Sequence, residues 1–241
     1  MVKYIHFKYG SFKYEEIKIN SNFLIKGRFS LRKSPKFPKE FSKPFWFYDL
    51  GKRLKRDNII SLGPYYPQSV FNINQIFIEN LKYPVFSNIV FNSKSGPLHK
   101  EQVNDYIKES RLEQLKIISN FYAHYLKEII GSLEYSEIVP VPAKPMYSFN
   151  SVEIISSEFS NIFKISMNLN RLERIKDENK EYIVNDDNDE FSSKKILLID
   201  DIITEKKTLD NILPKLKEKG CNKIDLITLA RTDHNIYEYN E

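Results

Sequence analysis

The sequence predicts an α/β fold, with a parallel sheet covered by helices and a β-rich region before it. Two observations support this prediction. Between about residues 100 and 230, segments with apolar residues at steps of three and four alternate with short apolar runs. The run at residues 196–199 is apolar at every position, as expected of a central parallel strand that helices cover on both faces.

The elements of the α/β part follow a turn-rich segment at residues 93–97, which divides the chain into regions 1–95 and 96–241. Gly131 and Gly220 end the first and third helical patterns. The two prolines of the first predicted strand indicate that it is an edge strand or that the prolines lie at a strand terminus. Helix and strand alternate in this order: 101–130, 138–142, 152–163, 196–199, 209–220 and 224–229. This alternation predicts right-handed crossovers, with ligands at the carboxyl ends of the strands.

The first 95 residues show a different pattern. Residues 1–31 alternate apolar and polar positions, and the polar residues 20–22 lie between two such runs, which predicts a hairpin or meander. Prolines predict a surface loop at 34–44 and a second irregular stretch at 61–67.

Composition limits the class of protein. The 241 residues, 41% of them hydrophobic, suffice for a globular domain with an extension. We expect a cytoplasmic protein without a membrane span, because no long apolar run or secretory signal is present. The single Cys221 excludes an internal disulfide and a cysteine-cluster zinc site, and we expect it to be structural.

Positive charge is concentrated at the start of the chain, where residues 1–60 hold fifteen Lys and Arg against five Asp and Glu. Together with many aromatic residues, this excess is compatible with a nucleic-acid surface. A Lys-rich composition with aromatic residues in the core explains it equally, and a protein-assembly surface or homodimer is a third possibility.

Two carboxylates, Asp200 and Asp201, directly follow the buried strand. Adjacent carboxylates can accept hydrogen bonds from the vicinal hydroxyls of a sugar, and a following helix N-terminus with Thr hydroxyls can bind a phosphate. This arrangement predicts a ribose-phosphate site. A helix-capping or solvated pair is the structural alternative. A response-regulator receiver is excluded, because the 41 residues from Asp201 onward are too few to complete one.

The sequence Lys-Ile-Leu-Leu-Ile-Asp-Asp-Ile-Ile-Thr at 195–204, with Thr208 and Leu209, resembles the phosphoribosyl pyrophosphate (PRPP) motif of type I phosphoribosyltransferases. The competence protein F (ComF-like) group is the most similar subfamily. The strand before the pyrophosphate loop of that group resembles Ile-Val-Pro-Val-Pro at 138–142. The segment with which sequences of the group usually end resembles Leu-Ala-Arg-Thr at 229–232. Phe149 and Asn150 stand where that group has an Arg-Gly-Phe-Asn-Gln stretch. The resemblance covers about residues 100–232.

This resemblance implies a magnesium-dependent PRPP or nucleotide site, with Mg²⁺ bound through the ligand. Asp200 and Asp201 would contact the ribose hydroxyls, and Lys144 would contact the pyrophosphate. The 5′-phosphate would lie against the loop formed by Thr204, Glu205, Lys206, Lys207 and Thr208. The N-terminal region would form the hood that selects the acceptor base. Arg171, Arg174 and Lys176 fall where the family has a mobile loop, although ordinary solvated charges are the alternative.

The chain departs from the family pattern at the phosphate loop, where Lys206 replaces a glycine, and it lacks the N-terminal zinc-ribbon cysteines. Two functions therefore stay open. One is a phosphoribosyltransferase that transfers phosphoribose to or from a nitrogenous base. The other is a non-catalytic module that senses a nucleotide or assists DNA handling.

Overall fold

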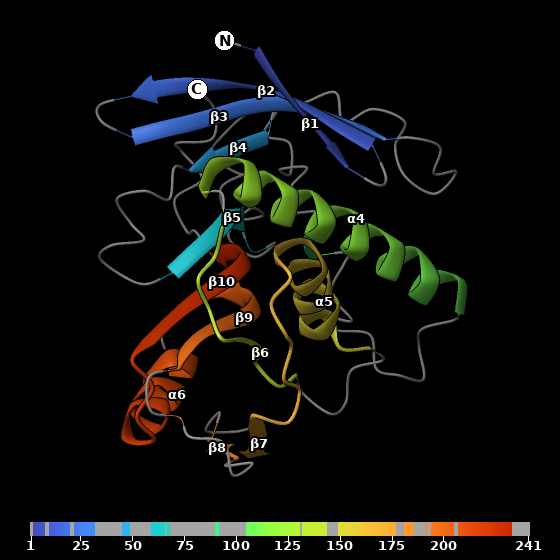
Figure 1. Cartoon of the computed structure of the whole chain (residues 1–241). Helices are drawn as coiled ribbons and strands as arrows, with labels where there is room; N and C mark the ends of the chain where they lie inside the picture. The colour runs from blue at the N-terminus through green and yellow to red at the C-terminus, as the bar shows by residue number, and fades with distance from the viewer. Residues whose placement is uncertain are drawn as a thin grey trace, which may run out of the picture.

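A computed structural model of the chain describes a set of segments that form two main sheets and three helices. These segments are residues 2–7, 10–19, 22–31, 45–48, 59–65, 67, 90–91, 105–130, 132–143, 149–176, 181–185, 191, 194–204 and 207–232. Figure 1 shows the N-terminal strands at one end of the molecule and the parallel sheet below them.

The N-terminal strands form an antiparallel meander in the order β1-β2-β3-β4. Their bounds are Val2–Phe7, Gly10–Ile19, Asn22–Leu31 and Phe45–Tyr48. Strands β2 and β3 pair up to Ile19 and Asn22, so that the last residue of the predicted turn at 20–22 is already the first residue of β3. The predicted meander is confirmed, whereas the predicted loop at 34–44 lies outside the described residues.

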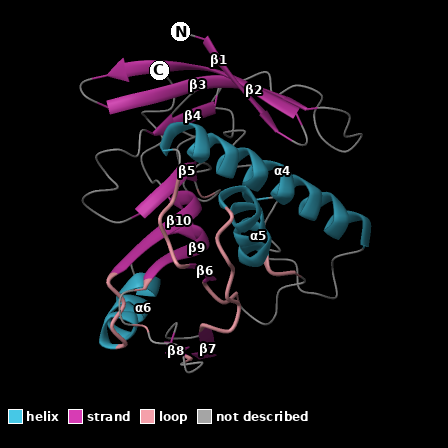
Figure 2. Ribbon diagram, viewed as in Figure 1, coloured by secondary structure: helices cyan, strands magenta, loops and turns pink. Residues whose placement is uncertain are grey.

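The second sheet is parallel throughout and has the order β5-β10-β9-β6. Its strands are β5 (Ile59–Tyr65), β10 (Lys223–Thr232), β9 (Lys195–Ile203) and β6 (Glu137–Pro140). This confirms the predicted α/β class, the central place of the 196–199 run and the edge position of the proline-containing strand. The N-terminal strands and the parallel sheet are both visible in Figure 2.

Strand β5 corrects one prediction. Residues 61–67 were expected to be irregular because of Gly63, Pro64 and Pro67, yet residues 59–65 form a strand that pairs with β10. Proline is tolerated there because β5 is the other edge of the sheet, where one side of the strand needs no ladder donor. The parallel sheet thus takes one strand from the first 95 residues.

Helices lie on both faces of this sheet. On one face, α4 (Asp105–Ile130) and α5 (Ser151–Phe163) enclose a core with residues of the sheet, including Leu197 and Ile199. On the other face, α6 (Lys207–Glu218) and the hairpin β7 (Leu172–Lys176) and β8 (Glu181–Val184) enclose a second core, which includes Ile196 and Leu198. In Figure 2, α4 and α5 lie next to each other, and α6 lies apart from both.

Local signals explain where the helices begin and end. Asn150 caps α5, because its side-chain oxygen accepts from the backbone N–H groups of Val152 at 3.1 Å and Glu153 at 3.3 Å. Lys164, with a φ of 60°, ends that helix in the left-handed region. Gly220, with a φ of 94°, follows α6, as expected of a glycine after a helix C-terminus. Helix α6 continues through Pro214.

In the part of the chain that the structure describes, none of the helices has both the length and the apolar character that a membrane crossing demands. Cys221 is buried, in agreement with its expected structural role.

Candidate functional site

The two acids lie within β9 rather than after it. The predicted strand ended at residue 199, but β9 continues to Ile203, so that Asp200 and Asp201 occupy its carboxyl-terminal part. The strand continues because β10 pairs with it as far as Ile203. Both acids are half-buried, so each is partly accessible at this edge of the sheet.

Backbone and side-chain donors orient both carboxylates. The backbone N–H of Asp201 donates to Asp200 Oδ1 at 2.8 Å, and that of Ile202 donates to Asp201 Oδ1 at 2.6 Å. Ser151 Oγ, from the first residue of α5, donates to Asp201 Oδ2 at 3.4 Å. The acids are therefore held in place by their own strand, and Asp201 is also tied to α5.

The acids leave β9 on opposite faces of the sheet. Ile199, just before them, packs in the core under α4 and α5, and Leu198 packs in the core under α6. Because successive side chains alternate along a strand, Asp200 leaves toward the α6 face and Asp201 toward the α5 face. The contact between Asp201 and Ser151 agrees with this direction. A ligand that contacts both acids therefore has to lie across the carboxyl end of β9.

The regular alternation stops immediately after the acids. Ile202 packs against the core that contains Ile199, and Ile203 belongs to the core that contains Leu198. Uninterrupted alternation would place them the other way round. The pairing with β10 keeps the same register on both sides, so this is a change in side-chain direction without a bulge.

The predicted phosphate loop is described only at its two ends. Thr204 is exposed after β9, and its hydroxyl lies 2.9 Å from that of Thr232, the last residue of β10. Lys207 begins α6, and Thr208 is buried in its first turn. Glu205 and Lys206 of the loop, and the predicted pyrophosphate ligand Lys144, lie outside the described residues.

One helix N-terminus lies beside the acids, and a second follows β9 in the chain. The Ser151 contact places the start of α5 beside Asp201, and α6 begins four residues after Ile203. The N-terminal ends of helices carry partial positive charge and unpaired N–H groups, which stabilise carboxylates and bind phosphates. At this edge of the sheet, the helix N-termini can thus stabilise the two carboxylates and also bind the phosphate of a ligand.

A metal ion fits this site only together with a ligand. The described residues contain no group of three His, Cys, Asp or Glu side chains that could hold a metal. Carboxylate oxygens suit Mg²⁺, which usually takes one or two of them and completes its shell with water and substrate phosphates. Asp200 or Asp201 would be the protein ligand of such a shell.

Several polar residues of this edge were missed by the sequence reasoning. Ser151 was not assigned a role, although Asn150 and Glu153 have the spacing of a helix-capping pair, which could have located the start of α5 beside the strand ends. Thr232 was noted only as part of a motif. Ser61 and Thr228 carried no signal, because their side chains meet across two strands that are distant in sequence.

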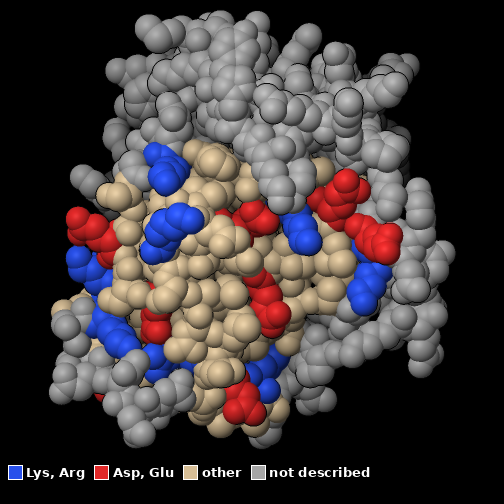
Figure 3. Space-filling view, turned by 45° about the vertical axis from the view of Figure 1, so that its right-hand side comes forward, with Lys and Arg blue, Asp and Glu red and all other residues tan. Residues whose placement is uncertain are grey.

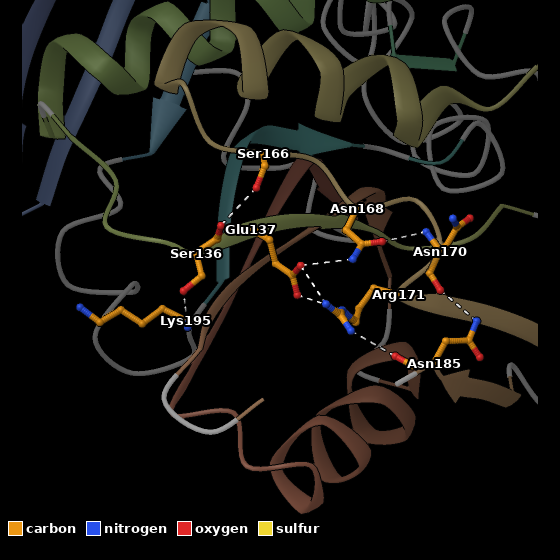
Figure 4. A network of polar contacts seen from close by, with 8 residues as sticks. All are labelled: Ser136, Glu137, Ser166, Asn168, Asn170, Arg171, Asn185 and Lys195. Atoms are coloured by element: carbon orange, nitrogen blue, oxygen red, sulfur yellow. Dashed lines mark hydrogen bonds and ion pairs between the residues drawn. The ribbon is translucent and has the colours of Figure 1, made fainter. Parts of the chain in front are cut away.

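Of the three basic residues at 171–176, Arg171 is not a solvated charge. Arg171 is fully buried, and it donates to Glu137 through Nε at 3.0 Å and Nη2 at 3.2 Å. Its guanidinium lies over the Phe191 ring, 4.5 Å from the centroid. Figure 4 shows this network, in which Asn168 also donates to Glu137 and Arg171 donates to the carbonyl of Asn185. Glu137 is the first residue of β6, so the pair lies at the amino end of that strand, away from the acids.

No protein-family model and no curated protein matches the chain. Among solved structures, about half of the chain is similar to type I phosphoribosyltransferases. A hypoxanthine phosphoribosyltransferase from Staphylococcus aureus matches with a TM-score of 0.36 and 16% identity, over 50% of this chain and 64% of that one. A purine phosphoribosyltransferase from Pyrococcus horikoshii matches with a TM-score of 0.35 and 16% identity, over 49% and 83%.

The UMP synthase of Leishmania donovani matches with a TM-score of 0.32 and 15% identity, over 52% of this chain and 24% of that one. The chain thus spans less than two thirds of the staphylococcal and leishmanial proteins. Similarities at these TM-scores and identities support neither an activity nor a ligand for this chain.

Proposed function

We propose that the carboxyl edge of the parallel sheet binds a phosphorylated ribose, either PRPP or a nucleotide. One observation carries this proposal: two half-buried consecutive carboxylates lie in the carboxyl-terminal part of a central strand, beside the N-terminus of α5 and ahead of α6 in the chain. Carboxylates suit the sugar hydroxyls, and the helix ends with their hydroxyl groups suit the phosphate.

Each acid has a distinct place in this proposal. The sugar lies across the tip of β9, so that Asp200 accepts from a hydroxyl on the α6 side and Asp201 from a hydroxyl on the α5 side. The 5′-phosphate lies at the start of α6, near Thr204 and Thr208. The side chain of Lys206 or Lys207 neutralises its negative charge. Lys144 and Mg²⁺ contact the pyrophosphate when PRPP is the ligand.

If the site is catalytic, the reaction is phosphoribosyl transfer. Departure of pyrophosphate from the anomeric carbon develops positive charge on the sugar and negative charge on the leaving group. The chain would contribute positioning of the ribose and charge stabilisation, both of which act without a nucleophilic side chain. A bound magnesium ion would add neutralisation of the pyrophosphate.

Calorimetric titration of the full chain tests the proposal, with PRPP and magnesium in one series and ribonucleoside 5′-monophosphates in another. We expect binding in at least one series, and at least a tenfold loss of affinity when Asp200→Asn and Asp201→Asn are combined, since hydrogen bonds to charged groups contribute about 1.5–3 kcal/mol. Glu218→Gln, an exposed carboxylate at the end of α6, is the matched control and should bind normally. Absence of binding to all of these ligands would reject the proposed function.

The alternative is a non-catalytic module of the ComF-like kind that senses a nucleotide or assists DNA handling. Lys206 favours it, because a side chain at the glycine position of the loop hinders close approach of the backbone to a phosphate. Tight nucleotide binding without release of pyrophosphate from PRPP in the presence of bases would select the module, and pyrophosphate release would select the enzyme.

A nucleic-acid surface on the basic N-terminal region stays a prediction, because the side chains of residues 1–60 lie outside the described part of the chain. On the face in Figure 3, the described Lys and Arg side chains are intermingled with Asp and Glu. The prediction rests on the excess of Lys and Arg in residues 1–60. A DNA-shift assay at two salt concentrations tests it, since phosphate contacts weaken steeply with salt, and gel filtration tests a homodimer.

A further inference from the structure

Ser151, the first residue of α5, approaches the acids from the α5 face of the sheet. Helix α5 follows β6 in the chain, so it begins on the side of the sheet where β6 ends, at the carboxyl edge. Side chains of a helix lean toward its N-terminus, and those of the first turn therefore point back toward this edge. The hydroxyl of Ser151 is thus directed at the strand end that carries the two acids.

The hydrogen of this hydroxyl has a defined acceptor. Ser151 Oγ lies 3.4 Å from Asp201 Oδ2. Only 4% of the surface of Ser151 is exposed, and a buried hydroxyl hydrogen needs an acceptor inside the protein. Among the described residues, the acceptor within hydrogen-bonding distance is this carboxylate. The hydroxyl therefore donates to Asp201.

The Asp201 carboxylate is held at both oxygens by two different elements. The backbone N–H of Ile202, on the same strand, donates to Oδ1 at 2.6 Å, and Ser151 donates to Oδ2 from α5. A single donor leaves a carboxylate free to tilt about one oxygen, whereas two donors fix its plane. Ser151 is itself held in place, because the Asn150 cap binds the backbone N–H groups of the two residues that follow it.

We propose that Ser151 is a positioning residue, which orients the Asp201 carboxylate toward a hydroxyl of the ribose. The 3.4 Å distance is longer than the roughly 2.5–3.0 Å of most hydrogen bonds from a hydroxyl to an oxygen. Long contacts of this kind in ligand-free sites often shorten when the ligand is bound, so its main effect falls on binding. The inference rests on the proposed function for that effect, but the contact can be tested without any ligand.

Ser156 provides a matched control within the same helix. It is a second fully buried serine of α5, and in the described part of the structure its hydroxyl has no hydrogen-bond partner. Ser156→Ala makes the same chemical change as Ser151→Ala but removes no donor from Asp201. An effect that comes from the loss of a buried hydroxyl alone should therefore appear in both variants.

The first test detects the contact in the ligand-free full chain. Carbon-13 NMR of protein labelled at the Asp carboxyl carbons is recorded, with the Asp201 signal assigned by its loss in Asp201→Asn. Ser151→Ala should move this signal, and Ser156→Ala should leave it in place. Ser151→Thr keeps a hydroxyl and should return the signal toward its original position. An Asp201 signal that stays fixed in Ser151→Ala, or moves equally in Ser156→Ala, would overturn the inference whether or not any nucleotide binds.

The second test separates positioning from stability by sugar recognition. It uses the ribonucleoside monophosphate that binds most tightly in the titration above and its 2′,3′-dideoxy counterpart, which offers neither sugar hydroxyl. An ordinary hydrogen bond corresponds to about three- to tenfold in affinity. Ser151→Ala should lose about that factor for the ribonucleotide and nothing for the dideoxy form, and Ser156→Ala should lose nothing for either. An equal loss for both nucleotides in Ser151→Ala would mean that Ser151 supports only the fold, and would overturn its positioning role.

A double-mutant cycle tests whether Ser151 acts through Asp201. In an Asp201→Ala background, Ser151→Ala should cause no further loss of ribonucleotide affinity, because the group that it orients is already absent. Additive losses would overturn the positioning role while the proposed function stands. If the original chain binds neither nucleotide, the proposed function and the positioning role fail together, and the NMR result alone decides on the contact.

Discussion

Arg171 and Glu137 form a two-point ion pair inside the protein, with Nε to Oε1 at 3.0 Å and Nη2 to Oε2 at 3.2 Å. The pair joins the start of β6 to the segment before β7, two places 34 residues apart in sequence. Asn168, Asn185 and Phe191 complete the surroundings of the two side chains. The pair is thus a specific link between the sheet and the β7–β8 hairpin.

Removing one charge of this pair should destabilise the protein strongly. Glu137→Gln leaves the Arg171 guanidinium buried without its counter-ion, and such a loss costs about 3–5 kcal/mol of unfolding free energy. Urea unfolding at neutral pH measures this change. Glu134→Gln is the control, because Glu134 pairs with Lys195 at the surface and exposed pairs contribute about 1 kcal/mol or less. Equal losses in the two variants would contradict the structural role of the buried pair.

The cap of α5 gives a second prediction on stability. Asn150→Ala removes the acceptor of two backbone N–H groups and should lower the unfolding free energy by about 1 kcal/mol. Asn161→Ala, at an exposed position in the last turn of the same helix, should change it little or raise it slightly, because alanine favours helices. Thermal unfolding of the two variants side by side checks the contrast, and a larger loss for the Asn161 variant would be inconsistent with the cap.

The hydroxyl pair of Thr204 and Thr232 gives a prediction on phosphate binding. When one hydroxyl donates to the other, the second hydrogen remains available to a ligand oxygen. Thr232→Val should therefore weaken binding of a nucleoside 5′-monophosphate by about three- to tenfold, the size of an ordinary hydrogen bond. Binding of the unphosphorylated nucleoside should not change, and Thr232→Ser should retain most of the affinity. Calorimetry with both ligands would refute the phosphate role if the two affinities fell together.

Cys221 predicts a dependence of stability on alkaline pH. Burial, with the nearby Glu137 charge, raises the pKa of its thiol to about 11, from 9.0 for an ordinary cysteine. Between these values the unfolded chain loses the thiol proton and the folded chain keeps it, so this contribution to stability is present below pH 9 and lost as the pH rises toward 11. Urea midpoints of the original chain and of Cys221→Ala at pH 8 and pH 10.5 test this. The fall with pH should be smaller in the variant, and identical falls would show that the thiol has no part in it.

Regular apolar patterns carried most of the fold prediction. The four apolar residues at 196–199 identified the centre of the sheet because only a strand covered on both faces needs them, and Pro140 identified an edge strand. The helical patterns at 101–130 and 152–163 matched α4 and α5 closely, because each places its apolar residues on one face.

Relationships between distant residues could not be predicted in the same way. Pro64 and Gly63 indicate a break when the chain is considered alone, but the pairing with β10 makes that segment a strand. Arg171 has the same local pattern as a solvated arginine, and its partner lies 34 residues earlier. At the proposed site, the acids were evident as a pair in sequence, whereas their directions depend on which helix covers each face. Ser151 lies beside Asp201 only through such tertiary pairing.

The early strand β5 has a practical consequence for work with fragments of this chain. A piece that starts at residue 96 would lack β5, and β10 would then form the margin of the sheet with its backbone donors and acceptors unpaired along one side. Residues 224–230 of that strand are all buried in the intact chain. An apolar margin of this kind pairs readily with other chains, so such a fragment should aggregate unless residues 59–65 are retained.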